Sequence, residues 1–141
     1  DLIRQRVQNG LPYIGWSAGS NLTGKTICTT NDMPIVQPES FGAFGFFPFQ
    51  LNPHYYNVVI EGFLGETRDQ RLTEYCLLNR GTPVVGLPEG TALQLADNRL
   101  QFLGEQPAVL FQTSGQEPMP TKTELTPCAD LSFLLHRYQN L

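Results

Sequence analysis

A short apolar stretch that leads into a Gly-x-Ser-x-Gly turn constrains this chain more than any other feature of its sequence. Residues 12–16 are typical of a strand and residues 18–23 of a short helix, so Ser17 stands on the tight turn between them. A nucleophilic serine occupies such a turn. The positions two before and two after it, Gly15 and Gly19, must then be very small, because neighbouring backbones approach closely there. An ordinary glycine-rich connection has the same pattern, so the motif alone leaves both interpretations open.

A nucleophilic serine also needs a base, an acid that orients the base, and donors for the developing oxyanion. The backbone N–H of Ala18 lies at the positive end of the predicted helix and is a candidate oxyanion donor. The chain has two histidines. His54 lies on a predicted proline-containing loop, where catalytic residues often occur, whereas His136 lies in an apolar C-terminal stretch and is expected to be structural or exposed. His54 is therefore the candidate base, and the alternative is a lone loop histidine without a catalytic role.

Among the thirteen carboxylates, Glu89 stands out because it directly follows a predicted buried strand at 83–87. The carboxyl ends of strands line the active crevice in open α/β sheets, and Ser17 ends its own predicted strand in the same way. Asp32, in a turn after a β-rich stretch, competes for the role of the acid. The order serine, histidine, acid differs from the serine, acid, histidine order of α/β-hydrolases, so the turn alone does not indicate an esterase.

The rest of the pattern predicts one α/β domain over residues 1–141, with a sheet that is parallel at first and antiparallel at its edges. The expected elements are helices at 1–9 and 66–79 (capped by Thr67), strands at 26–30, 83–87 and 108–112, a hairpin of 91–96 with 100–103 around Asp97-Asn98, loops at 50–55 and 114–120, and an aromatic core-filling segment at 41–49.

Composition excludes several classes of protein. With 40% hydrophobic and 16% charged residues the chain is globular, and a net charge of −4 without a basic block argues against a nucleic-acid partner. No apolar run is long enough for a membrane span. The spacing of Cys28, Cys76 and Cys128 fits neither a metal knuckle nor a disulfide framework, so we expect buried free thiols in a reducing compartment. We expect no metal site and no cofactor.

Five motifs, in this order, resemble peptidase E, the aspartyl dipeptidase family, over nearly the whole chain. They are GWSAGSN at 15–21, TTNDMPI at 29–35, LNPHY at 51–55, GETRDQR at 65–71 and GLPEG at 86–90. The resemblance implies a serine peptidase in which Ser17 is the nucleophile, His54 the base, Glu89 the acid that orients His54, and the N–H of Ala18 an oxyanion donor. No cysteine occupies the turn, so glutamine hydrolysis of the amidotransferase kind is not expected.

The resemblance also implies a substrate, a dipeptide with aspartate at its free N-terminus. Arg68 would bind the side-chain carboxylate, because a planar guanidinium binds carboxylates through two parallel hydrogen bonds. The alternative for Arg68 is a residue of the first helical turn that pairs with Glu66 or Asp69. For Asp32 the resemblance implies a structural turn or a site-shaping role.

The family fold implied is a three-layer, mostly parallel α/β sheet with antiparallel edge hairpins, like that of class I glutamine amidotransferases, in a cytoplasmic protein. The family domain has earlier strands and a glycine-rich loop with a second oxyanion donor, so residues 1–141 are expected to be its C-terminal portion. An uncovered strand edge pairs readily with another chain. We therefore expect a companion N-terminal fragment or self-association. A cyanophycinase-like peptidase and a non-catalytic remnant or oligomer-forming module are the alternative functions.

Overall fold

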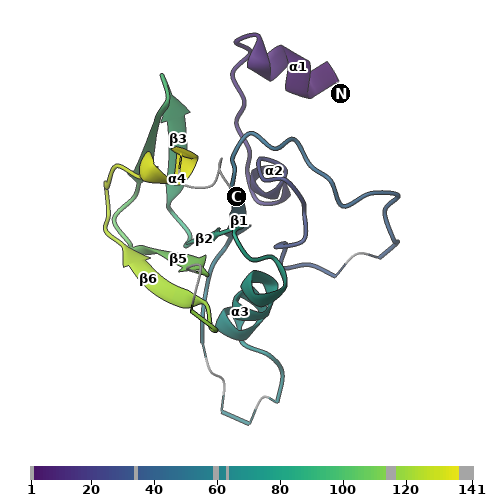
Figure 1. The fold of residues 1–141 in the computed structure, drawn as a ribbon, viewed down its shortest axis with the longest axis vertical. Helices are drawn as coiled ribbons and strands as arrows, with labels where there is room; N and C mark the ends of the chain where they lie inside the picture. Colours follow the sequence, from purple (N-terminus) through teal and green to yellow (C-terminus); the bar gives the residue numbers. More distant parts are fainter. Residues whose placement is uncertain (1, 34, 59–60, 63, 114–116, 137–141) are drawn as a thin grey trace.

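The structure is a computed structural model that describes residues 2–33, 35–58, 61–62, 64–113 and 117–136. A four-stranded sheet has the order β1-β2-β5-β6, and a separate hairpin is formed by β3 and β4 (Figure 1). The strands are β1 (Gln50–Pro53), β2 (Val84–Leu87), β3 (Ala92–Ala96), β4 (Arg99–Leu103), β5 (Ala108–Gln112) and β6 (Thr121–Leu125). The helices are α1 (Leu2–Gln8), α2 (Ala18–Asn21), α3 (Arg68–Leu78) and α4 (Phe133–His136).

The sheet is mixed. Strand β1 pairs with β2 in parallel, whereas β2 with β5 and β5 with β6 are antiparallel. The α/β prediction is therefore confirmed, but in the described part of the chain only one of three pairs in this sheet is parallel, rather than most of them. Antiparallel neighbours need only short connections, which suits the hairpin-rich second half of the sequence.

Helix α3 forms where the sequence predicted it, because its N-terminus satisfies its own backbone donors. The hydroxyl of Thr67 accepts a hydrogen bond from the backbone N–H of Gln70, and the Gln70 side chain accepts one from the N–H of Thr67, at 3.2 and 2.8 Å. The helix buries Leu72 and Cys76 against the sheet. The predicted hairpin is also confirmed, with Asp97 and Asn98 in the left-handed conformation that its two-residue turn requires.

Two predicted strands are absent. Residues 12–16 form no strand because no strand in the described part of the chain lies alongside them, and Ile14 and Trp16 are 93% and 82% exposed. Residues 26–30 make a single bridge, between Thr26 and Gly42, and then bend and turn. The residues at these positions favour a strand, but no neighbouring strand among the described residues pairs with them, and an unpaired segment does not form a strand.

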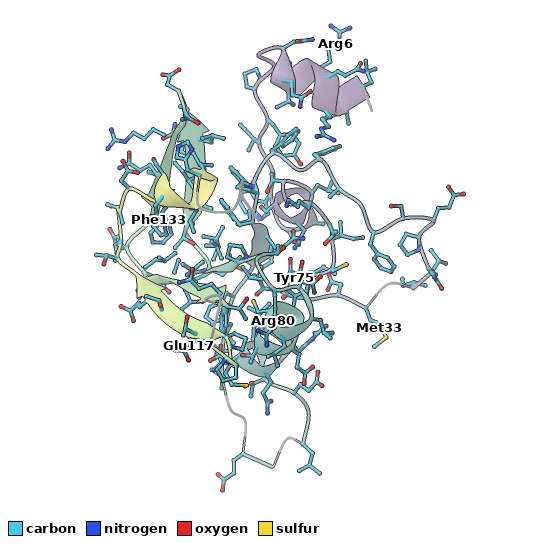
Figure 2. All side chains as sticks on the ribbon, viewed as in Figure 1. Arg6, Met33, Tyr75, Arg80, Glu117 and Phe133 are labelled. Carbon is cyan, nitrogen blue, oxygen red and sulfur yellow. The ribbon has the colours of Figure 1, made fainter. Side chains whose placement is uncertain are left out.

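The predicted loop at 50–55 is wrong for its first four residues, which form β1, whereas His54 and Tyr55 lie outside the strand as predicted. The polar residues Gln50 and Asn52 obscured this strand in the sequence. Both are almost fully buried, and their amides hydrogen-bond neighbouring groups, among them Thr26 and Tyr75 for Gln50. Figure 2 labels Tyr75 on α3. The sequence analysis also missed β6.

The sheet has a hydrophobic core on each face. The smaller core lies under α3, and the larger one includes residues of β1, β2, β4, β5 and α4. Phe47 and Phe49 stack in the larger core, with ring centroids 4.8 Å apart, whereas Phe41 is 42% exposed, so core filling holds for only part of the aromatic segment. All three thiols are free, but Cys76 alone is buried, and the expectation of buried thiols is wrong for Cys28 and Cys128.

Helix α1 ends as predicted at Asn9-Gly10, with Gly10 at positive φ. It has no buried residue and projects away from the sheet in Figure 1. In the predicted loop at 114–120, residues 117–119 are exposed, and 114–116 lie outside the described residues. The part of the chain that the structure describes contains no helix with the length and apolar character that a bilayer span needs.

Candidate active site

Ser17 lies on a strained turn immediately before α2. Its φ of 50° and ψ of −117° are unusual for a residue with a side chain, and such strain costs about 1–3 kcal/mol and concentrates at functional positions. Although Ser17 is the N-cap residue of α2, its hydroxyl makes no capping hydrogen bond. Ser17 is half-buried, and its hydroxyl is not used to cap the helix.

Two hydrogen bonds close the turn at 15–19, which we call the elbow. The hydroxyl of Tyr13 donates to the carbonyl of Gly19 at 2.7 Å, and Ser20 Oγ donates to the carbonyl of Gly15 at 3.0 Å. A Cβ on Gly15 would lie 2.4 Å from the Gly19 carbonyl oxygen, so the predicted need for glycine is confirmed there. Among the described residues outside the backbone of α2, a Cβ on Gly19 would meet only the Tyr13 hydroxyl, at an ordinary 3.7 Å, so the same expectation is wrong for Gly19 in this chain.

The backbone N–H of Ala18 faces no acceptor in the described part of the chain, as an oxyanion donor requires. Helix α2 is tied to the sheet at its other end, where the buried side chain of Asn21 donates to the carbonyl of Leu51 at 2.8 Å. The elbow is therefore held against β1, the strand that leads to His54.

The parallel pairing of β1 with β2 places His54 beside Glu89. Pro53 lies opposite Leu87, and the N–H of Tyr55 donates to the Leu87 carbonyl at 2.9 Å, so His54 comes just beyond the paired ends. Its Nδ1 hydrogen-bonds Glu89 Oε1. The side chains are 39% and 75% exposed, so both remain open to solvent in this chain.

The turn that carries Glu89 is fixed by its neighbours. Thr91 Oγ1 donates to the carbonyl of Pro88 at 2.6 Å, and Gly90 has φ of 73°. Gly104 packs closely on this turn, because a Cβ there would lie 2.8 Å from the Thr91 side chain. These contacts hold the backbone of the turn from which the Glu89 side chain extends.

One cavity of about 280 Å³ brings the three predicted catalytic residues together. Ser17, His54 and Glu89 all line it, with Trp16 and Pro88 among the apolar residues around them. No described atom hydrogen-bonds Ser17 Oγ, and a catalytic contact of this kind commonly tightens only when substrate binds. The roles of these residues are therefore still predictions, now with a shared location.

Arg68 lines a different cavity, of about 210 Å³, next to Arg71 and Glu66. Its Nη1 donates to Asn31 Oδ1. Neither carboxylate considered in the sequence analysis pairs with it: Glu66 makes no ion pair in the described part of the chain, and Asp69 binds Lys122 Nζ at 2.7 Å. Burial lowers the pKa of Arg68, as does Arg71 nearby, while Asp32 and Tyr55 act in the opposite direction.

Asp32 lies in an exposed turn, where its N–H donates to Thr30 Oγ1 at 3.4 Å. It lines a third cavity, which shares no lining residue with the one that His54 and Glu89 line. The neighbouring Met33 extends outward from this loop in Figure 2 and is 88% exposed. Of the two competing acids, the structure brings Glu89 to the histidine.

Sequence reasoning gave no role to Tyr13, Asn31 or Asn52, although the structure places each next to a site residue. Tyr13 closes the elbow, and Asn31 contacts Arg68, Asn52 and the carbonyl of Pro53. Asn31 and Asn52 lie in two of the motifs shared with the peptidase E family, and that placement was the available signal.

Comparisons with known proteins complete this description. The model of peptidase family S51 matches residues 1–103. Relatives named Peptidase E include that of Shewanella sp. (strain ANA-3), 55% identical over 126 residues, 89% of this chain and 53% of the relative. That of Nostoc sp. (strain PCC 7120) is 50% identical over 137 residues, which are 97% of this chain and 54% of the relative. That of Shewanella amazonensis is 50% identical over 134 residues, which are 95% of this chain and 55% of the relative. The chain spans about half the length of the curated relatives it matches.

Proposed function

The chain belongs to peptidase family S51, and we propose that its Ser17, His54 and Glu89 form the catalytic triad of a serine peptidase. The observation that carries this proposal is the hydrogen bond between His54 Nδ1 and Glu89 Oε1 in a cavity that Ser17 also lines. A base that is oriented by an acid, next to a serine on a strained turn, is the arrangement that nucleophilic catalysis needs.

In this mechanism Ser17 Oγ attacks the carbonyl carbon of the scissile peptide bond while His54 Nε2 takes the hydroxyl proton. Glu89 holds Nδ1–H and stabilises the positive charge on the ring. The tetrahedral intermediate collapses when the C–N bond breaks and His54 returns the proton to the leaving amine, which leaves an acyl-enzyme. Water, deprotonated by His54, then hydrolyses the ester and restores Ser17.

The N–H of Ala18 is proposed to donate to the oxyanion, because it has no acceptor in the described part of the chain. The second donor is proposed to come from the half of the family domain that this chain does not span. Removal of one oxyanion donor typically costs about 10²–10³ in rate. The chain is therefore expected to be a weak catalyst by itself.

The proposed substrates are dipeptides with an N-terminal aspartate, bound through Arg68. The guanidinium has no carboxylate partner in the described part of the chain, so it has donors left for a substrate carboxylate. Its cavity is separate from that of Ser17, and the proposal therefore requires the two to communicate when substrate binds. Asp32, close enough to affect the pKa of Arg68, is proposed to shape this site.

We further propose that residues 1–141 are the C-terminal portion of a domain like that of class I glutamine amidotransferases. The exposed Ile14 and Trp16 support a companion segment that pairs along residues 12–16, since such side chains are normally covered in a central strand. Self-association through the same edge is the competing arrangement. The unpaired thiols suit a reducing compartment, and a cytoplasmic location is proposed on that ground.

The test is hydrolysis of aspartyl p-nitroanilide by this chain, with and without the N-terminal half of the Nostoc relative supplied as a second polypeptide. We expect activity that depends on the added half and disappears in Ser17→Ala. Alanyl p-nitroanilide, which lacks the side-chain carboxylate, is the control substrate.

Each result separates the alternatives. Activity that survives Ser17→Ala contradicts the serine mechanism. No activity with the added half, although the two polypeptides associate, favours a non-catalytic remnant. Hydrolysis restricted to an aspartate-rich polymer favours a cyanophycinase-like peptidase.

A further inference from the structure

Asn31 uses both ends of its side-chain amide. Its Oδ1 accepts from Arg68 Nη1 and, at 2.5 Å, from Asn52 Nδ2, while its Nδ2 donates to the carbonyl of Pro53 at 2.8 Å. The backbone carbonyl of Asn31 also accepts from Arg71 Nη1 at 3.4 Å. An amide can accept two hydrogen bonds at its oxygen and donate from its nitrogen. An ionised carboxylate cannot donate, and an apolar group can do neither.

The partners of Asn31 belong to two different parts of the molecule. Arg68 opens helix α3, whereas Asn52 and Pro53 lie at the end of strand β1, directly before His54. Asn52 is 1% exposed, and its Nδ2 also donates to the carbonyl of Thr29 at 2.8 Å. A buried and doubly bonded amide has little freedom to move, so the Asn31 side chain is held against a rigid strand.

Side chains close the edge of β1 that faces away from β2. The carbonyl of Leu51 accepts from Asn21 Nδ2 and from Thr29 Oγ1, at 2.8 and 2.7 Å, and the carbonyl of Pro53 accepts from Asn31. Carbonyls two residues apart in a strand point to the same side. Asn31 provides the last of these bonds, at the residue that precedes His54.

We propose that Asn31 is a positioning residue that joins the guanidinium of Arg68 and the end of β1 before His54 into one hydrogen-bonded unit. The proposal rests on the proposed function, in which Arg68 binds the substrate carboxylate and His54 is the base. A carboxylate that binds Arg68 then weakens the hydrogen bond from Arg68 to Asn31. The resulting change in the Asn31 side chain reaches His54 through its hydrogen bond to the carbonyl of Pro53. Asn31 would thus link two cavities that share no lining residue.

The experiment records backbone amide NMR signals of the ¹⁵N-labelled chain during titration with L-aspartate. His54 and Arg68 report on the two ends of the unit, and the exposed His136, at the end of α4, is the internal reference. The variant is Asn31→Ala. Its matched control is Asn79→Ala, which also removes a bond from an asparagine Nδ2 to a backbone carbonyl, that of Tyr75 at 2.9 Å, at the C-terminal end of α3.

We expect aspartate to shift the amides of Arg68 and His54 in the wild type and in Asn79→Ala, and that of Arg68 alone in Asn31→Ala. The proposal is overturned if His54 responds equally with and without the Asn31 amide, or if Arg68 responds in the wild type and His54 does not. If aspartate does not bind, the test is the chemical shift of the His54 amide without ligand, which must differ between Asn31→Ala and the wild type.

A kinetic arm separates this proposal from the proposed function. In the chain supplied with the N-terminal half, Asn31→Ala is expected to raise KM for aspartyl p-nitroanilide by about tenfold, as for the loss of one charge-assisted hydrogen bond, and to lower kcat as well. An unchanged kcat contradicts the link to His54. No Ser17-dependent hydrolysis, with the NMR coupling intact, contradicts the peptidase alone. Should Asn31→Ala fail to fold, Asn31→Asp keeps an oxygen that accepts from Arg68 and Asn52 and removes the donor to the Pro53 carbonyl, and the same loss of the His54 response is expected.

Discussion

The two elbow glycines, which look equivalent in the sequence, are expected to respond oppositely to alanine. In Gly15→Ala the new methyl carbon would lie 2.4 Å from the carbonyl oxygen and 2.7 Å from the carbonyl carbon of Gly19. It would also lie 2.9 Å from Tyr13 Cε1. The first contact is about an ångström closer than ordinary van der Waals contact, and its partner is backbone, which cannot turn away.

The cost of Gly15→Ala follows from these contacts. Overpacking typically costs about 1–3 kcal/mol, and displacement of Tyr13 would weaken its 2.7 Å hydrogen bond to Gly19, which is worth about 1 kcal/mol. We expect a loss of about 2–4 kcal/mol in the free energy of unfolding. Gly19 lies in α2 at ordinary φ, so Gly19→Ala should be neutral or stabilise by up to about 1 kcal/mol.

The measurement is urea unfolding of the wild type and both variants, compared at equal denaturant slope. Where the catalyst is reconstituted, Gly15→Ala should also lose about 10²-fold in rate, because a shift of an ångström at Ser17 misaligns the nucleophile. Equal midpoints for the two variants, or a less stable Gly19→Ala, would refute the reasoning from the elbow geometry.

Three further outcomes are expected. Glu89→Gln should lower kcat of the reconstituted peptidase by about 10²–10⁴ with little change in KM, because the His54 ring loses its charged partner; an unchanged kcat contradicts the acid role. A thiol reagent should modify Cys28 and Cys128 in the folded chain and Cys76 only on unfolding, since burial raises the pKa of Cys76 to about 12. Burial also raises the pKa values of Tyr13, Tyr55 and Tyr75 above the ordinary 10.0, so folding stability should fall as pH rises through the folded values; phenolate absorbance of folded and urea-unfolded chain checks this.

Elements with strong local signals were predictable from the sequence. Helix α3 has a capping box at Thr67 and Gln70, and the β3–β4 hairpin has Asp97 and Asn98, residue types that tolerate positive φ. Strand β2 is an uninterrupted buried run before Glu89. In each case the residues that specify the element lie within it, so no tertiary contact was needed to find it.

Strand β1 shows what local reasoning misses. Gln50 and Asn52 argue against a buried strand until their hydrogen-bond partners are known, and those partners come from residues 26–31 and from α3. The reverse error occurred at residues 12–16, whose apolar pattern suits a central strand but which pair with no strand in the described part of the chain. Strand formation depends on what lies alongside, and a sequence segment does not contain that information.

The backbone itself gives an independent reason to regard the shared cavity as a site. Five described residues other than glycine have positive φ: Asp97 and Asn98 are explained by their hairpin turn, and Cys128 lies in a turn closed by the hydrogen bond from Ala129 N–H to the Thr126 carbonyl. Ser17 and His54 also have positive φ, at 50° and 54°, without a turn of that kind, at about 1–3 kcal/mol each. They come from segments far apart in the sequence and yet line one cavity. Strain at both positions is maintained by surrounding bonds, through Tyr13 and Ser20 at the elbow and through Glu89 at the histidine, which is the condition under which strained residues persist at functional sites.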